Sequence, residues 1–226
     1  MDLIEAIKQR RSIRAYKATP VPKQAIEEII SLARLSPSAT NYQPWEFIVL
    51  TGKSLETAKR VNVEQMEAEA PITPDFKALP PNQLASPYGD RQAALARTLF
   101  DTMGIERHDK SARYAWQVKG KRFFDAPAAI WIAADETIFN EQHQISLVDL
   151  GIATQTIALA ALEFDLGTCI QQDTIFYPGA LRKALDIPAS KLLIVSISIG
   201  YPDWDAPANQ FRSEREVIEA MVSWKV

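Results

Sequence analysis

The feature that most constrains the fold of this chain is one long apolar segment, Ile145–Phe164. Its apolar residues cover nearly all sides of a helix, and a helix of that kind lies inside a protein or spans a membrane. Asp149, Gln155 and Glu163 place polar or charged groups along the segment. Such groups are costly inside a bilayer. The segment therefore predicts a central helix that is buried by the rest of the chain.

Strands and helices are predicted to alternate around this helix. Four apolar stretches have the length of strands, namely Trp45–Leu50, Ala128–Ala134, Thr168–Gln172 and Leu192–Ile199. Helical patterns cover a first helix capped by Asp2 and reaching Lys8, then Pro22–Leu35, Leu55–Val63, Arg91–Met103, Lys110–Arg122, Pro178–Leu185 and Glu214–Met221. This alternation is typical of an α/β or α+β layered domain. The 226 residues show no internal repeat and predict one substantial core.

Charge and cysteine content exclude several classes of protein. The net charge of −3 argues against a nucleic-acid binder, which is usually basic. The single cysteine, Cys169, cannot form an internal disulfide, which favours a reducing compartment. The segment Met1–Glu5 carries two acids and lacks the apolar core of a secretory signal. We expect a cytoplasmic protein that binds neither nucleic acid nor a membrane.

Several kinds of catalytic apparatus are missing from the sequence. There are two histidines and one cysteine, with no HExxH or CxxC spacing, so we expect no metal site. No nucleophile elbow of the G-x-S-x-G type occurs. The eight glycines form neither a G-x-G-x-x-G pattern nor a P-loop. If the chain is an enzyme, a bound cofactor therefore carries the difficult chemistry.

A short basic segment, Arg10–Arg14, is the first candidate binding element. Its sequence is Arg-Arg-Ser-Ile-Arg. In an extended chain, Arg10, Ser12 and Arg14 leave the backbone on the same side. Two guanidinium groups with a hydroxyl between them suit a phosphate-bearing ligand. The alternative is a solvated basic patch after a short helix.

The second candidate element is Pro37–Trp45, Pro-Ser-Ala-Thr-Asn-Tyr-Gln-Pro-Trp, which runs directly into a predicted strand. Together with Arg10–Arg14 it resembles the nitroreductase-like flavoprotein family, whose members open with these two elements at this spacing. The resemblance resumes at Leu166–Gln171 and again at Gly200–Pro202 followed by Phe211-Arg212. It covers most of the chain, and four motifs in the correct order make it specific.

The resemblance implies an α+β fold with a mixed central sheet flanked by helices. It implies one domain over residues 1–226 with a variable helical and loop insertion at about 63–124, and an intertwined homodimer with FMN at the subunit interface. Met103–Arg107 and Phe123–Pro127 are most similar to the branch of aromatic nitroreductases and nitrobenzoate reductases.

The implied activity is that of an FMN-dependent NAD(P)H oxidoreductase reducing nitroaromatic or quinone-type acceptors by a ping-pong mechanism. NAD(P)H would be a transient co-substrate. Three alternatives are a reductive dehalogenase, a flavin-dependent dehydrogenase of the same fold, and a flavin-binding protein without turnover.

The resemblance also implies roles for individual residues. Arg10 and Arg212 would bind the FMN phosphate, with Ser12 near the phosphate or the ribityl chain. Arg14 would tune the N1/O2 side of the ring. The remaining implied contacts are Pro37, Ser38, Ala39 and Asn41, which pack on the flavin from the partner subunit, and Ile170 and Gln171, which approach its N5 edge. Considered without the family, Arg212 is a solvated surface residue and Asn41 an Asx-turn.

The sequence departs from the family pattern in two places. Members often carry a glycine pair or an acid after the position of Ile170, where this chain has Gln171 and Gln172. A second basic residue often lies two before the C-terminal arginine, where this chain has Gln210. Arg11 or a residue of the insertion is the candidate that compensates for the missing charge.

The insertion contains a proline-rich half, Ala70–Asp90, which we expect to be a loop. Five aromatic residues lie in or after it: Tyr88, Tyr114, Trp116, Phe123 and Phe124. They either pack the insertion's own small core or contribute to a lid that selects planar acceptors by stacking.

Overall fold

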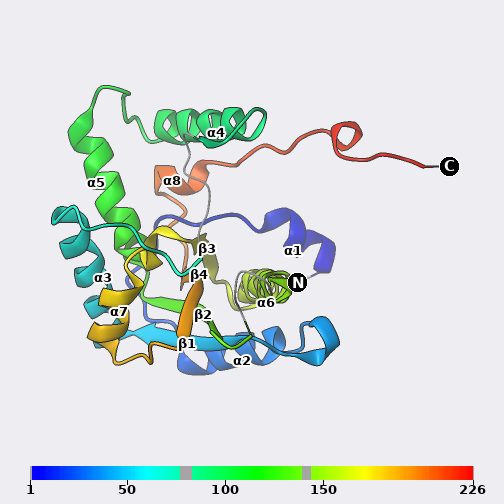
Figure 1. Cartoon of the computed structure of the whole chain (residues 1–226). Helices are drawn as coiled ribbons and strands as arrows, with labels where there is room; N and C mark the ends of the chain where they lie inside the picture. The colour runs from blue at the N-terminus through cyan, green and yellow to red at the C-terminus, as the bar shows by residue number, and fades with distance from the viewer. Residues whose placement is uncertain (1, 77–82, 139–143, 226) are drawn as a thin grey trace.

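The protein is described here from a computed structural model covering residues 2–76, 83–138 and 144–225. Four strands form one sheet in the order β1-β2-β4-β3 (Figure 1). Their bounds are Glu46–Thr51 for β1, Ala128–Asp135 for β2, Gly167–Gln171 for β3 and Lys191–Gly200 for β4. All three strand pairings are antiparallel. The sheet is therefore antiparallel rather than mixed as predicted, and the parallel pairing of Ser12 with Thr168 is an isolated bridge beside it.

Helices surround this sheet and confirm the predicted α+β class. They are α1 (Leu3–Gln9), α2 (Lys23–Ala33), α3 (Gly52–Glu67), α4 (Tyr88–Thr102), α5 (Lys110–Lys121), α6 (Ile145–Ala160), α7 (Pro178–Leu185) and α8 (Pro207–Gln210). Each predicted strand lies within one residue of an observed strand at both ends. The predicted helices at 110–122 and 178–185 match α5 and α7 closely, whereas α3 extends beyond its prediction at both ends.

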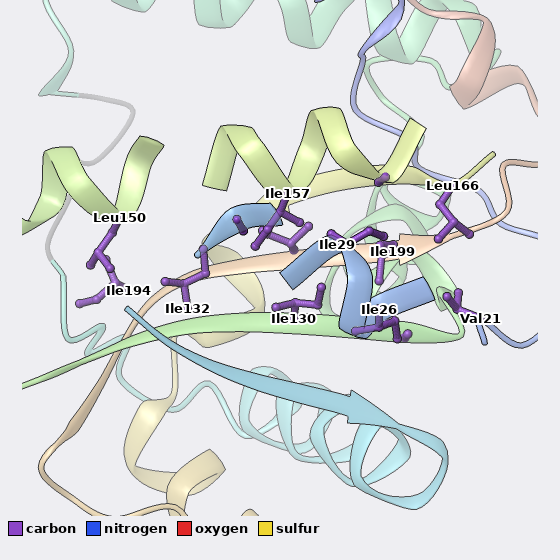
Figure 2. Close-up of a cluster of buried hydrophobic side chains, with 14 of the residues drawn as sticks. Val21, Ile26, Ile29, Ile130, Ile132, Leu150, Ile157, Leu166, Ile194 and Ile199 are labelled. Carbon is purple, nitrogen blue, oxygen red and sulfur yellow. The ribbon is translucent and has the colours of Figure 1, made fainter. Parts of the chain in front are cut away.

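The central strand β2 explains why the sheet is covered on both faces. Its burial is nearly complete, and successive side chains point to opposite faces. Ile130 and Ile132 pack in a cluster with α2 and α6 (Figure 2). Trp131 packs in the cluster on the other face, with α3 and α7. An almost continuous apolar run such as β2 is what a strand with two buried faces requires.

Helix α6 confirms the central helix predicted from the apolar segment. It continues from Ile145 into a 3-10 turn that ends at Phe164. By length and composition alone, this stretch could cross a membrane, but Leu150 and Ile157 are fully buried in the core cluster of Figure 2. Its outer side carries Val148, which is 58 % exposed.

The predicted C-terminal helix, Glu214–Met221, is wrong. The structure has only a 3-10 turn at Ile218–Ala220, on an arm that extends away from the body (Figure 1). The apolar side chains of Val217, Met221 and Trp224 are 64 %, 64 % and 85 % exposed. A helix this short is not stable unless its apolar face is packed, and these three apolar side chains are exposed.

The start of the proline-rich half is fixed to the body by an ion pair that is mostly shielded from solvent. Arg182 of α7 donates both of its terminal nitrogens to the carboxylate of Asp75, at 2.5 and 3.1 Å. The amide of Leu193 donates to the same carboxylate at 2.8 Å. The two side chains are only 16 % and 9 % exposed. We call this group the Asp75 clip. The predicted loop, residues 70–90, is therefore anchored near its start. Residues 77–82 lie outside the described residues. Helix α4 begins at Tyr88, before the predicted end of the loop.

Candidate functional site

The two ends of the chain meet at a cavity of about 280 Å³ with a strongly basic lining. Six cationic residues line it: Lys8, Arg10, Arg11, Arg14, Arg212 and Arg215. Ile7, Ser12, Leu95, Phe211 and Ser213 complete the wall. We call it the basic pocket. It joins five of the predicted site residues, from positions as far apart in sequence as Arg10 and Arg212.

The N-terminal wall of the basic pocket has the extended geometry predicted from its spacing. Asp2 caps α1 by accepting from the amide of Ile4 at 3.0 Å, and the helix ends at Gln9. The amide of Ile13 then donates to the carbonyl of Thr168 at 2.9 Å, which aligns the segment with β3. The side chain of Ile13 is 2 % exposed. Arg10, Ser12 and Arg14 line the pocket as predicted, Arg11 lines it as well, and Ile13 is buried.

The glycine at the start of β3 is required by this close approach. A Cβ at Gly167 would lie 2.4 Å from the Cγ1 atom of Ile13 and 2.8 Å from a ring carbon of Pro202. No larger residue fits there without displacing the segment that carries the pocket arginines.

The C-terminal wall is held by a residue that sequence reasoning missed, Asn209. Its side chain is fully buried in α8 and accepts from the amide of Arg14 at 2.7 Å. It also donates to the carbonyls of Ala15 and Asp203, at 2.8 and 2.7 Å. Arg212 lies three residues further on and donates to the carbonyl of Lys8 at 3.3 Å. Asn209 therefore joins the two chain ends, and only its distance in sequence from Arg14 concealed this role.

The electrostatics of the basic pocket favour an anion. Within the described residues, none of its six cations lies within ion-pair distance of a carboxylate. Burial lowers the pKa of Arg11, and the nearby charge of Arg212 lowers it further. The Arg11 guanidinium lies 4.7 Å from the ring centroid of Trp204. Crowded like charges of this kind are relieved by a bound phosphate, which guanidinium groups hold well.

The end of β3 presents its two predicted residues differently. Ile170 is 40 % exposed, whereas Gln171 is 6 % exposed and points inward. The Gln171 amide donates to the carbonyl of Gly120 and to Asp173, both at 3.2 Å, and accepts from the Ser198 hydroxyl. Its side chain is therefore hydrogen-bonded inside the protein. Only the main chain of Gln171 remains a candidate for the predicted contact with the N5 edge of the flavin.

Behind this strand end lies a buried polar network. Lys121 donates to the carbonyl of Asp173 at 2.6 Å and lies 4.4 Å from the ring centroid of Phe176. Burial raises the pKa of Asp173, and the Lys121 charge opposes that shift. Burial also raises the pKa of the Cys169 thiol to about 11, so the thiol is neutral near pH 7. These groups support the strand from within and do not line the basic pocket.

The loop predicted to contact a flavin, residues 37–41, lies elsewhere in the chain. The amide of Ala39 donates to buried Asp149 of α6 at 3.1 Å, and the hydroxyl of Ser38 accepts from the amide of Gln43 at 2.9 Å. Asn41 adopts a φ of 64°, a conformation that asparagine tolerates. Pro37, Ser38, Ala39 and Asn41 are absent from the lining of the basic pocket. Within one chain the structure does not bring the loop and the pocket together.

Comparison with known proteins decides the family. The model of the nitroreductase family matches residues 7–201. The chain belongs to the nitroreductase family. This membership confirms the resemblance seen in the motifs and assigns the chain to the flavin-dependent oxidoreductases.

Individual relatives are similar to the chain along nearly its whole length. The chain is 29 % identical to a nitrobenzene nitroreductase of Ectopseudomonas oleovorans, over 97 % of this chain and 95 % of the relative. It is 29 % identical to a 4-nitrobenzoate reductase of Pseudomonas putida, over 96 % of this chain and 93 % of the relative. The crystal structure of the FMN-dependent nitroreductase NfnB from Mycobacterium smegmatis, in complex with NADPH, superposes with a TM-score of 0.90 at 27 % identity, and each chain is covered fully.

Proposed function

We propose that this chain is an FMN-dependent NAD(P)H oxidoreductase that reduces nitroaromatic or quinone-type acceptors. The observation that carries the proposal is the basic pocket, where Arg10, Arg14 and Arg212 converge without a carboxylate partner among the described residues. Its charge and its hydroxyl suit the phosphate end of FMN. Family membership and the aromatic substrates named for the relatives support the rest.

Four pocket residues have distinct tasks in this proposal. Arg10 and Arg212 would hold the FMN phosphate, and the hydroxyl of Ser12 would donate to it or to the ribityl chain. Arg14 would place a fixed cation by the N1/O2 side of the ring, where reduction develops negative charge. When bound, FMN supplies the hydride chemistry between the nicotinamide donor and the acceptor.

We propose a ping-pong order in which donor and acceptor use the same open site in turn. The acids nearest the end of β3 are buried, so protons would come from solvent and not from a side chain. The exposed side chain of Ile170 would help to keep the adjoining surface apolar, which favours planar aromatic rings.

We also propose that the enzyme is a cytoplasmic homodimer with flavin at the subunit interface. Two features support the dimer: residues 37–41 lie outside the pocket of their own chain, and the C-terminal arm exposes Val217, Met221 and Trp224. Exposed apolar patches rimmed by polar residues typically mark interfaces. In light scattering, a stable monomer loaded with FMN would contradict this proposal.

The insertion, taken as residues 63–124 of a single domain, is proposed to set the acceptor. Its aromatic residues divide into two groups. Phe123 and Phe124 are buried, and Trp116 lies against Phe124 in a tilted arrangement with ring centroids 5.2 Å apart, so these three serve packing. Tyr88 and Tyr114 are 63 % and 48 % exposed and remain available to acceptors. Tyr88→Ala should change the ratio of kcat/KM for nitroaromatic and quinone substrates, with Phe124→Leu as the packing control.

The deciding experiment is spectroscopic. The purified protein should carry a yellow chromophore that NADH or NADPH bleaches under anaerobic conditions, and a nitroarene or a quinone should restore the colour. A colourless protein that FMN cannot reconstitute would exclude the proposal. Bound FMN that neither donor reduces would indicate a flavin-binding protein without turnover. Turnover of halophenols above nitroarenes and quinones would indicate a reductive dehalogenase.

A further inference from the structure

We propose that Lys8 and Arg215 form a second anion subsite in the basic pocket, which binds the 2′-phosphate of NADPH and makes the enzyme prefer NADPH to NADH. The inference rests on the proposed function, since it concerns the donor used at the same pocket. It assigns a task to two residues that neither the motifs nor the spacing singled out.

The basic pocket holds more positive charge than the phosphate of FMN requires. A phosphate monoester carries about two negative charges at neutral pH. Arg10 and Arg212 already match the FMN phosphate, Arg14 is assigned to the ring, and Arg11 lies against Trp204. Lys8 and Arg215 remain, and both are exposed and line the same cavity. Two surplus cations at one place favour a second dianion.

Hydrogen bonds within the chain hold the side chain of Arg215 and the main chain of Lys8. The Nη1 atom of Arg215 donates to the hydroxyl of Ser213 at 2.7 Å and to the carbonyl of Glu214 at 2.8 Å. The main-chain carbonyl of Lys8 accepts from Arg212 at 3.3 Å. The C-terminal segment and α1 therefore each contribute one of these cations to the lining of the basic pocket.

Two acids flank Arg215 in the sequence. Glu214 and Glu216 could cancel its charge, but neither lines the pocket. Glu216 is paired with Arg91 of α4 at 2.8 Å. Helix α4 also contributes Leu95 to the pocket wall. Arg91 of the insertion thus neutralises Glu216, an acid close in sequence to the anion subsite. In this way the insertion would influence the preference for NADPH.

NADH and NADPH share the pyrophosphate, so only the 2′-phosphate can distinguish them. A dianionic phosphate matches the two charges of Lys8 and Arg215 better than a single carboxylate does. An acceptor that carries a carboxylate, such as a nitrobenzoate, is the competing source of negative charge.

The test measures binding to the FMN-loaded enzyme by calorimetry, with 2′,5′-ADP as the probe and 5′-AMP as its partner lacking the 2′-phosphate. We expect 2′,5′-ADP to bind the wild type more tightly. Arg215→Ala and Lys8→Ala should each weaken it by about tenfold and leave 5′-AMP unchanged. Arg60→Ala, which removes an exposed arginine on α3, is the matched control and should change neither. Equal affinities for the two probes in the wild type would overturn the inference.

A rescue experiment tests the role of α4. Arg91→Ala should leave Glu216 without its partner and weaken the binding of 2′,5′-ADP by up to about fivefold, as expected for exposed charges. Arg91→Ala combined with Glu216→Gln should restore the affinity, because the released charge is gone. A double variant as weak as Arg91→Ala alone would contradict this link.

Four outcomes separate this inference from its rivals and from failure of the proposed function. Loss of FMN in Arg215→Ala would place Arg215 at the FMN phosphate and overturn the second subsite. An altered ratio of 4-nitrobenzoate to nitrobenzene turnover, with an unaltered ratio of NADPH to NADH, would assign the subsite to the acceptor and overturn it as well. Equal reduction by both donors would sink this inference alone, whereas failure of both donors to reduce the flavin would sink the proposed function.

Discussion

The basic pocket and the Asp75 clip are both built from charged side chains, and they are arranged in opposite ways. In the clip, Asp75 and Arg182 pair through two hydrogen bonds and are largely shielded from solvent. In the pocket, six cations lie together and none has a carboxylate partner among the described residues. One region satisfies its charges within the chain, and the other leaves them for a ligand.

The difference separates stability from binding. A buried pair that loses one partner leaves an uncompensated charge in a poor solvent, so each member is needed for folding. Cations that repel one another oppose folding slightly until an anion neutralises them. Substitutions in the clip should therefore change the free energy of unfolding, and substitutions in the pocket should change ligand affinity.

The largest expected effect comes from breaking the clip. Asp75→Ala should lower the free energy of unfolding by about 3–5 kcal/mol, because it strands the Arg182 charge and the amide of Leu193. Urea denaturation measures this. Glu64→Ala, which removes the exposed partner of Arg60 on α3, should have little effect. FMN affinity per folded molecule should be unchanged, and a loss of affinity would show that the two regions are coupled.

The second effect comes from the pocket. Arg212→Ala should raise the dissociation constant for FMN by roughly tenfold to a hundredfold, since a charge-assisted hydrogen bond is worth about 1.5–3 kcal/mol. The unfolding free energy of the FMN-free protein should stay the same or rise, because one repelling cation is gone. Fluorescence of released FMN and denaturation of the FMN-free protein measure the two quantities. Destabilisation as large as in Asp75→Ala would break the comparison.

How far the sequence predicts these two regions depends on the range of their contacts. The strands follow from local apolar runs, and the two-residue spacing of Arg10, Ser12 and Arg14 places them on one wall. Arg212 joins them only through the family resemblance. Nothing local in the sequence identifies Asp75 as the partner of Arg182, because the two are separated by 107 positions.

Two further features could not be derived from local patterns. The sequence predicts a helix at Glu214–Met221, but the apolar side chains of this segment are not buried against the described chain, and only a 3-10 turn forms. Gln171 looks like an exposed polar residue at a strand end, yet it is buried because Gly120, Asp173 and Ser198 provide its partners. In both cases tertiary contacts, present or missing, decide the outcome.

The third prediction divides the pocket itself. Arg14→Ala should lower the two-electron potential of bound FMN by about 30 mV, which corresponds to roughly 1.4 kcal/mol, because a cation near the reduced ring is lost. It should weaken FMN binding less than Arg212→Ala does. A potentiometric titration with retention measured in parallel gives both numbers. If the two variants behave alike in both assays, the proposed division of tasks is incorrect.

The smallest expected effect concerns Asp173, a charge that is buried yet belongs to neither region. Burial raises its pKa above the ordinary 3.8, so the folded protein holds its proton where the unfolded chain has released it. The stability contributed by Asp173 is therefore complete below 3.8 and is lost as the pH rises through the raised pKa. The Asp173→Asn variant has no ionisable group here and does not lose this stability. The difference between its free energy of unfolding and that of the wild type should therefore rise with pH between 3.8 and the raised pKa of Asp173, and then level off. Urea denaturation between pH 3.5 and pH 7, roughly the window in which buried carboxyls titrate, measures this difference. A relative free energy that falls with pH would mean that Lys121 stabilises the ionised carboxylate more than burial opposes it, and Asp173 would then resemble the charges of the clip.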